Sequence, residues 1–245
     1  MFTAIGEIAE QMQTRAFAIG GCVRDALLHR NQSKDIDIVC EGSGIELAKT
    51  VADQLPNSGK VSIYKNYGTA MVRVGSYELE FVGARKESYK KNSRNPVVES
   101  GSLEDDQKRR DFTVNALAFA LNPNEFGTLI DPFDGLEDID KKVLKTPLTA
   151  AQTFSDDPLR MLRAVRFAAQ LDFTIDPSTM KSIQIMAERI KILSQERVVE
   201  EIHKILLTQK PSKGFLLLDK LGLLQHIFPE LCSLKGIEEV EGQRH

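Results

Sequence analysis

Alternating hydrophobic and polar positions predict strands in the first half of the chain. The apolar run at residues 16–19 fits a buried strand, and residues 35–39 alternate acid and aliphatic side chains with a period of two. Apolar positions over residues 44–55 repeat with helical spacing instead. On this pattern we expect helices at residues 1–15, 23–29 and 44–55, and strands at residues 16–19, 35–39, 60–64, 69–74 and 77–82.

The pattern becomes almost entirely helical after Pro147. Helical spacing, with Pro, Ser or Asp near each start, predicts helices at residues 156–170, 177–190, 194–208 and 211–224. Before Pro147, the polar stretch from Arg85 to Asp106 is typical of a long loop, and such loops are usually functional or mobile. An α+β fold follows, with a mixed-sheet head and an all-helical neck and body. The expected parts are a head at residues 1–145, a neck at 146–210 and the start of a body at 211–245.

The composition is that of an ordinary globular protein, because 42% of the 245 residues are hydrophobic and 27% are charged. No apolar run approaches the length of about 18 residues that a membrane span needs, and the N-terminus lacks the order of a secretory signal. Three scattered cysteines fit a reducing compartment, so we expect a cytoplasmic protein without a membrane partner. The net charge of −3 excludes a uniformly basic surface for nucleic acid but allows a local basic patch.

Asp35 and Asp37 are the first residues with an evident chemical use. Because they stand two positions apart on a predicted strand, they share one face. Two such carboxylates can bind hard divalent cations through oxygen, as in two-metal sites that activate a hydroxyl and stabilise a leaving group. Acids that keep an exposed edge strand in solution would show the same spacing, so this pattern alone leaves both interpretations open.

A pair of glycines stands between the first predicted strand and the helix that follows it. Gly20 and Gly21 would let the backbone pass close to a phosphate, at a helix N-terminus that favours an anion. Arg24 adds a charge-assisted donor on the same turn. The alternative is a tight turn with an ordinary surface arginine. The acid pair that begins 15 residues after Gly20 favours a phosphate site.

The segment from Gly20 to Val39 resembles the signature of the class II CCA-adding tRNA nucleotidyltransferases and bacterial poly(A) polymerases. Three further motifs of that family follow in its order. They are residues 109–117 (RRDFTVNAL), 131–135 (DPFDG) and 156–164 (DDPLRMLRA), with Asp156 in place of the family's usual Glu. Ordered motifs are far more specific than any one of them. The resemblance implies a nucleotidyltransferase head with the polymerase beta-like fold.

The resemblance also implies roles for residues of the head. Asp35 and Asp37 would hold Mg²⁺, and Glu80 is a candidate third catalytic carboxylate because an acid precedes an arginine at a similar distance in relatives. For Glu80, solubility of a strand edge is an equal alternative. The residues expected to bind the nucleotide in the head are Gly20, Gly21, Arg24, Arg110, Asp111 and Asn115.

The last motif would read the base of the nucleotide. On a helix, Asp157, Arg160 and Arg163 occupy one side. An Asp acceptor beside an Arg donor can mimic a base edge, and in the family this pair accepts ATP and CTP and rejects GTP and UTP. A plain surface salt bridge is the alternative. Arg166 lies in the apolar arc of the same helix, so it either pairs with a buried carboxylate or reaches the triphosphate, and we include it among the candidate nucleotide ligands.

The function implied is Mg²⁺-dependent, template-independent addition of CCA to the 3′ end of tRNA from CTP and ATP. The alternatives are a poly(A) polymerase, partial addition of A only or CC only, and a non-catalytic RNA-binding module on the same fold. Mild acidity argues against a non-specific poly(A) polymerase, as does the likeness of residues 194–202 to the segment after the neck of CCA-adding enzymes. Residues 240–245 resemble the lead-in to an appended HD-type domain, so we expect a chain truncated before a C-terminal domain. The oligomeric state is left open.

Overall fold

The computed structural model describes residues 1–30, 34–65, 68–88, 97–235, 239–240 and 243–244. The chain divides into two compact units. Unit 1 comprises Met1–Lys141 with Thr146–Leu148, and unit 2 comprises Lys142–Lys145 with Thr149–His245. The mixed sheet of unit 1 and the helices of unit 2 confirm the predicted α+β class. The finer division into head, neck and body stays a prediction.

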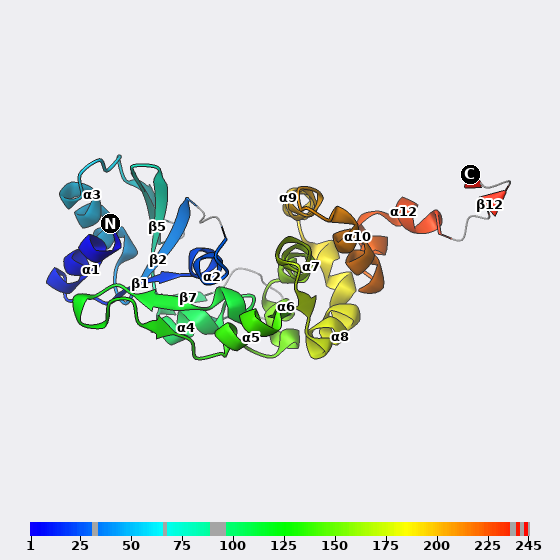
Figure 1. The fold of residues 1–245 in the computed structure, drawn as a ribbon, viewed down its shortest axis with the longest axis horizontal. Coiled ribbons are helices and arrows are strands. Elements are labelled where there is room, and N and C mark those ends of the chain that lie inside the picture. Colours follow the sequence, from blue (N-terminus) through cyan, green and yellow to red (C-terminus); the bar gives the residue numbers. More distant parts are fainter. Residues whose placement is uncertain (31–33, 66–67, 89–96, 236–238, 241–242, 245) are drawn as a thin grey trace. The chain divides into compact units, whose positions relative to one another are not determined.

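A seven-stranded mixed sheet forms the centre of unit 1, in the order β3-β4-β5-β2-β1-β8-β9 (Figure 1). β2 and β5 run parallel, and the other neighbouring pairs are antiparallel. β2 is therefore hydrogen-bonded on both of its sides. The strands are β1 (Ala16–Ile19), β2 (Asp35–Cys40), β3 (Ser62–Tyr64), β4 (Thr69–Val74), β5 (Tyr77–Gly83), β8 (Ala118–Ala120) and β9 (Leu129–Ile130).

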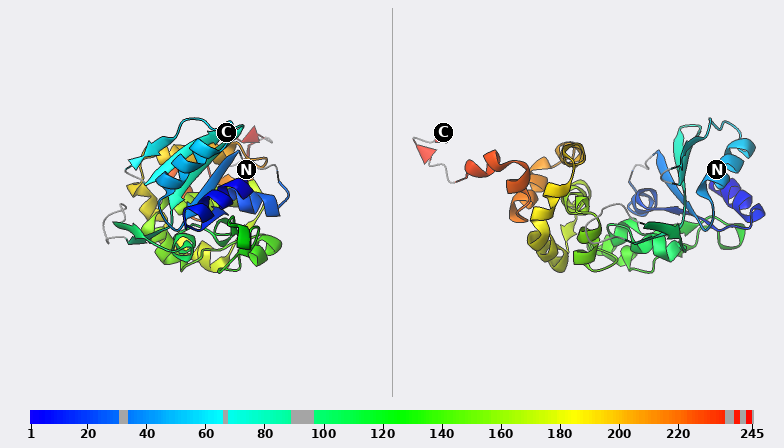
Figure 2. Two further views of the ribbon diagram at one scale, coloured as in Figure 1. Left: turned by 90° about the vertical axis from the view of Figure 1, so that its left-hand side faces the viewer. Right: turned by 180° about the vertical axis from the view of Figure 1, so that it is seen from behind.

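One face of this sheet is apolar and covered by helices. Ile36 and Ile38 of β2 lie beside Leu79 and Phe81 of β5, and all four side chains are buried. α3 packs against β4 and β5, and α1 lies beside α3 (Figures 1 and 2). The helices of unit 1 are α1 (Phe2–Gln11), α2 (Gly21–Leu27), α3 (Gly44–Gln54), α4 (Leu103–Lys108) and α5 (Gly135–Lys141), with 3₁₀ turns η2 (Thr113–Asn115) and η3 (Pro123–Glu125).

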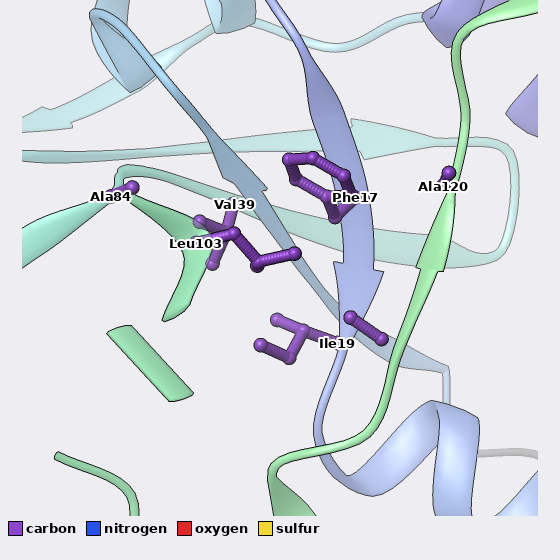
Figure 3. Close-up of a cluster of buried hydrophobic side chains, with 7 residues drawn as sticks. Phe17, Ile19, Val39, Ala84, Leu103 and Ala120 are labelled. Atoms are coloured by element: carbon purple, nitrogen blue, oxygen red, sulfur yellow. The ribbon is translucent and has the colours of Figure 1, made fainter. Parts of the chain in front are cut away.

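The opposite face carries the acid pair at one end and a hydrophobic cluster at the other. The register places Asp37 beside Ile19, and Val39 beside Phe17, so these side chains share one face. Leu103 of α4 packs into this cluster, which brings α4 onto the face that carries the acids (Figure 3). The buried members of the cluster are Phe17, Ile19, Val39, Ala84, Leu103, Ala118 and Ala120.

The predicted long loop between Arg85 and Asp106 is wrong. The structure has an antiparallel pair there, β6 (Arg85–Ser88) with β7 (Val97–Ser100), and then α4. The polar composition concealed the pair because it forms a separate two-stranded sheet instead of extending the core sheet. α4 begins at a capping box, in which the hydroxyl of Ser102 accepts from the backbone N–H of Asp105 and the Asp105 carboxylate accepts from that of Ser102.

Unit 2 is a set of packed helices with a few two-residue strands that the all-helical prediction did not include. α7 follows Pro158, and ten of its residues are buried. The main contact of α7 is with α9. The elements are β10 (Val143–Leu144), α6 (Ala150–Asp156), α7 (Leu159–Leu171), β11 (Thr174–Ile175), α8 (Pro177–Met186), η4 (Ala187–Ile192), α9 (Gln195–Leu206), α10 (Pro211–Lys220), α11 (Leu224–Ile227), α12 (Pro229–Ser233), β12 (Glu239–Val240) and β13 (Gln243–Arg244).

Within the described ranges of both units, no helix combines the length and the apolar character that crossing a membrane requires.

Replacing Phe17 by Ala should lower the free energy of unfolding by about 3–5 kcal/mol, because a fully buried aromatic ring is lost from the cluster under α4. Urea unfolding followed by circular dichroism measures the change. Phe126→Ala is the matched control, since the Phe126 side chain is 49% exposed and its loss should cost much less. Equal losses for the two variants would contradict the assignment of the core to this face.

Candidate functional site

At the turn between β1 and α2, Gly20 lies close to the side chains of Arg110 and Asp37. Gly20 adopts a φ of 86°, in the left-handed region that favours glycine. A Cβ atom at Gly20 would lie 2.8 Å from Nη1 of Arg110 and 3.2 Å from Oδ2 of Asp37. The position therefore needs glycine for its backbone angle, and a Cβ there would also displace the Arg110 guanidinium. At Gly21 an added Cβ would meet only Arg24, at an ordinary contact distance of 3.5 Å.

Asp35 and Asp37 lie on the same face of β2, as the alternation predicts. Burial raises the pKa of Asp37, Arg110 opposes this shift, and the charges of Asp106 and Asp35 add to it. Nη1 of Arg110 lies 3.9 Å from Oδ2 of Asp37, so the two charges face each other without a direct hydrogen bond. Asp37 is therefore a crowded carboxylate that a nearby positive charge stabilises.

Glu80 is the neighbour of Asp37 on β5, in parallel register. Burial raises the pKa of Glu80, the charge of Asp37 raises it further, and Arg85 and Arg110 act in the opposite direction. The structure thus brings Glu80 beside the acid pair. Its catalytic role stays a prediction.

The acid pair fits Mg²⁺ if a nucleotide completes the coordination. Across the parts of the chain that the structure describes, no three or more His, Cys, Asp or Glu side chains are grouped so that they could hold a metal ion. Mg²⁺, however, is usually bound by one or two carboxylates together with substrate phosphates and water. Asp35 and Asp37 supply such a pair, on a strand that is paired on both sides.

Arg110 is held by groups on two segments. Its Nε donates to Oδ2 of Asp106 at 3.2 Å, and its Nη1 donates to the carbonyl oxygen of Asn115 at 3.5 Å. Only 16% of the side chain is exposed. Asp106 was not predicted from the sequence, although Arg110 was; Asp106 is fully buried and also accepts from Arg109. The available signal was the spacing, because an acid three and four residues before two arginines can bind both on a helix.

Arg24, Asn115 and Asp111 form a buried network beneath the glycine turn. Nη1 of Arg24 donates to Oδ1 of Asn115 at 2.5 Å, and Nδ2 of Asn115 donates to Oδ1 of Asp111 at 2.9 Å. The other side of the Arg24 guanidinium binds both carboxylate oxygens of Asp25. Arg24 is 4% exposed, so the structure gives it a part in shaping the turn. Direct contact of these three residues with a nucleotide stays a prediction.

In unit 2, the partner of Asp157 is Arg197 of α9 and not Arg160. Oδ2 of Asp157 accepts from Nη2 of Arg197 at 3.0 Å, and Oδ1 accepts from the backbone N–H of Leu159 at 3.1 Å. Arg160 donates to the carbonyl oxygen of Thr153 at 3.4 Å. The sequence left a surface salt bridge between Asp157 and Arg160 as the alternative to base recognition. The structure shows a different pairing for Asp157. Local spacing could not predict Arg197 as the partner, because Arg197 lies 40 residues from Asp157.

Arg166 pairs with a buried carboxylate, which is the first of its two alternatives. Its Nε donates to Oε2 of Glu201 on α9 at 2.6 Å. The guanidinium groups of Arg163 and Arg166 lie 5.2 Å and 3.9 Å from the centre of the Phe167 ring. Arg166 is 8% exposed and joins α7 to α9, so it takes part in the packing of unit 2, and contact of Arg166 with a nucleotide stays a prediction.

Comparison with known families and proteins identifies related molecules. The family described as "Poly A polymerase head domain" matches residues 16–145, and the family described as "Probable RNA and SrmB-binding site of polymerase A" matches residues 172–235. An A-adding tRNA nucleotidyltransferase of Aquifex aeolicus is 40% identical over 190 residues, which are 77% of this chain and 22% of the relative. A CCA-adding enzyme of Limosilactobacillus reuteri is 38% identical over 219 residues, 89% of this chain and 52% of the relative. The chain thus spans between about a fifth and about half of these relatives.

A solved structure shares the fold over nearly the whole chain. It is a tRNA nucleotidyltransferase complexed with a primer tRNA and an incoming ATP analog, with a TM-score of 0.80 and 35% identity, covering 97% of this chain and 64% of that one.

Replacing Arg110 by Met should raise the pKa of Asp37 further above its ordinary value, because the guanidinium charge opposes the effect of burial. NMR of the Asp37 carboxyl carbon through a pH titration measures this pKa. Arg15→Met is the matched control, since Arg15 pairs with Glu41 and Glu125 instead. An Asp37 pKa that is the same in both variants would show that Arg110 does not act on the acid pair.

Proposed function

Because this chain belongs to the family of poly A polymerase head domains, we propose that it adds CCA to the 3′ end of tRNA from CTP and ATP, without a template. The observation that carries the proposal is the placement of Asp35 and Asp37 on one strand face with Arg110 beside them. The similarity to an A-adding and a CCA-adding enzyme supports tRNA as the acceptor. The match of residues 172–235 to an RNA-binding family supports a role of unit 2 in holding RNA.

The reaction we propose is in-line attack by the RNA 3′-hydroxyl on the α-phosphorus of the nucleotide, with pyrophosphate as the leaving group. Asp35 and Asp37 would bind Mg²⁺ jointly with the phosphates. When bound, the metal activates the hydroxyl and offsets the charge that develops on pyrophosphate. Arg110 would bind phosphate oxygens, since a guanidinium matches their geometry with two parallel donors. Because Gly20 has no side chain, Arg110 and Asp37 can both approach it closely.

Base choice would lie with Asp157, which is the extended residue that ends α6 and not part of a helix as the sequence predicted, and with Arg160 in the first turn of α7. Arg163 would follow Arg160 on α7, three residues further along. Cytosine and adenine both carry an amino group, which donates to a carboxylate, and a ring nitrogen, which accepts from a guanidinium. Uracil and guanine present a carbonyl oxygen at the position of that amino group. Arg197 and the N–H of Leu159 hold the Asp157 carboxylate from both oxygens, which supports a fixed acceptor at this position.

Addition of A alone is the second candidate function. The Aquifex aeolicus relative, at 40% identity, is an A-adding enzyme. Both activities need the same acid pair, so base and RNA selection separate them. The net charge of −3 continues to disfavour a non-specific poly(A) polymerase.

Titration of the chain with each ribonucleoside triphosphate and Mg²⁺ by calorimetry tests the proposal without RNA. Binding of ATP and CTP, with GTP and UTP much weaker, is the expected result. Binding of ATP alone would favour A-only addition, and no binding of any nucleotide would overturn the proposal.

Asp35→Asn and Asp37→Asn should each abolish nucleotide addition to tRNA that lacks its 3′ end, because the pair would lose a charge needed to hold the cation. Incorporation of labelled CTP and ATP measures the activity, and circular dichroism checks the fold. Asp53→Asn, at an exposed acid of α3, is the matched control and should remain active. Near-normal turnover of either site variant would remove that residue from the metal site.

Asp157→Ala should reduce the preference for CTP and ATP over UTP and GTP by about ten- to a hundred-fold, which is the worth of a hydrogen bond to a charged group. Competition among the four nucleotides in the same incorporation assay gives the preference. Unchanged discrimination would mean that another group reads the base.

A further inference from the structure

Asp106 is a buried charge that the proposed reaction does not use. None of its side chain is exposed, and its two oxygens are divided between two arginines. Oδ1 accepts from Nε of Arg109 at 2.9 Å, and Oδ2 accepts from Nε of Arg110 at 3.2 Å. A buried carboxylate needs such partners, and in return it determines where they lie.

The helix that carries Asp106 is fixed at several points. Leu103 packs into the hydrophobic cluster beneath the helix (Figure 3), and its backbone N–H donates to Oε1 of Glu41 at 2.9 Å. Nε2 of Gln107 donates to the carbonyl oxygens of Ala116 and Ile130 at 2.6 Å and 3.2 Å. Asp106 therefore acts on Arg110 from a rigid support.

Arg110 lies between two carboxylates that attract it. Its bond to Asp106 is at hydrogen-bond distance, whereas 3.9 Å separates its Nη1 from Oδ2 of Asp37. Without the negative charge of Asp106, attraction would draw the guanidinium towards Asp37, since both groups are partly removed from water. Arg110 would then neutralise Asp37 and would no longer be available to phosphates.

We propose that Asp106 is a positioning residue of the nucleotide site, which holds Arg110 over the Gly20 turn and away from Asp37. This inference rests on the proposed function, because it takes Arg110 as a ligand of the triphosphate. Asp106 acts through Arg110 and touches neither nucleotide nor metal.

The test compares ATP with AMP as probes by calorimetry. EDTA is present so that protein groups, and no metal ion, bind the phosphates. Asp106→Asn should weaken ATP binding by about tenfold while AMP binding changes little, because only the longer phosphate chain needs Arg110. In the Arg110→Met background, Asp106→Asn should have no further effect on the ATP preference. Glu104→Gln is the matched control, on the same helix but in an exposed pair with Lys108, and should bind as the wild type does.

A second measurement keeps the inference testable if Asp106→Asn does not fold, as thermal unfolding would show. In the wild type, NMR should find the Nε–H of Arg110 protected from exchange with and without ATP, because Asp106 accepts it in both states. Rapid exchange in the ATP complex would overturn the inference. If the wild type binds ATP but Asp106→Asn keeps the same preference for ATP over AMP, this inference alone is overturned. If the wild type binds neither ATP nor AMP, nor any triphosphate with Mg²⁺, the proposed function is overturned with it.

Discussion

The position of one guanidinium, that of Arg110, governs the geometry of the site in unit 1. Asp106 holds it from the buried side, and Asp37 attracts it from the strand. Gly20 takes a left-handed backbone angle, and Arg110 and Asp37 approach the space that a Cβ would fill. The turn, the acid pair and α4 are thus parts of one electrostatic arrangement, although they come from segments separated by up to 90 residues.

The acid pair shares its sheet face with the hydrophobic core, and this makes the charged carboxylates less stable. Phe17 and Val39 continue the face of Asp37 into a cluster from which water is excluded. Burial consequently raises the pKa of Asp37, and a further acid in parallel register adds negative charge. Such a face is unfavourable for folding alone, and proteins commonly retain unfavourable features where activity needs them. A cation and a nucleotide would relieve the repulsion.

Local patterns were sufficient to predict most elements of the sheet and the positions of the candidate residues on them. The alternation around Asp35 placed β2 and its polar face correctly, and the glycines located the turn after β1. The patterns failed where partners lie far apart in sequence. The pairing of β6 with β7, and the bond of Asp157 to Arg197, depend on contacts that periodicity cannot register. Asp106 was overlooked because its polar neighbours in sequence suggested a loop, although it is buried under the arginines it holds.

Each unit contains a buried ion pair between an acid and an arginine. In unit 2, the buried pair of Arg166 and Glu201 joins α7 to α9, and α9 in turn brings Arg197 to Asp157. Buried ion pairs add little net stability, but loss of one partner typically costs about 3–5 kcal/mol, so they restrict a fold to one arrangement. In unit 1 the buried Asp106 holds Arg110 beside Asp37, and in unit 2 the buried pair joins α7 to α9, which carries Arg197 to Asp157. Because the arginines beside Asp37 and Asp157 are held in this way, the surroundings of both carboxylates depend on residues that no ligand needs to touch.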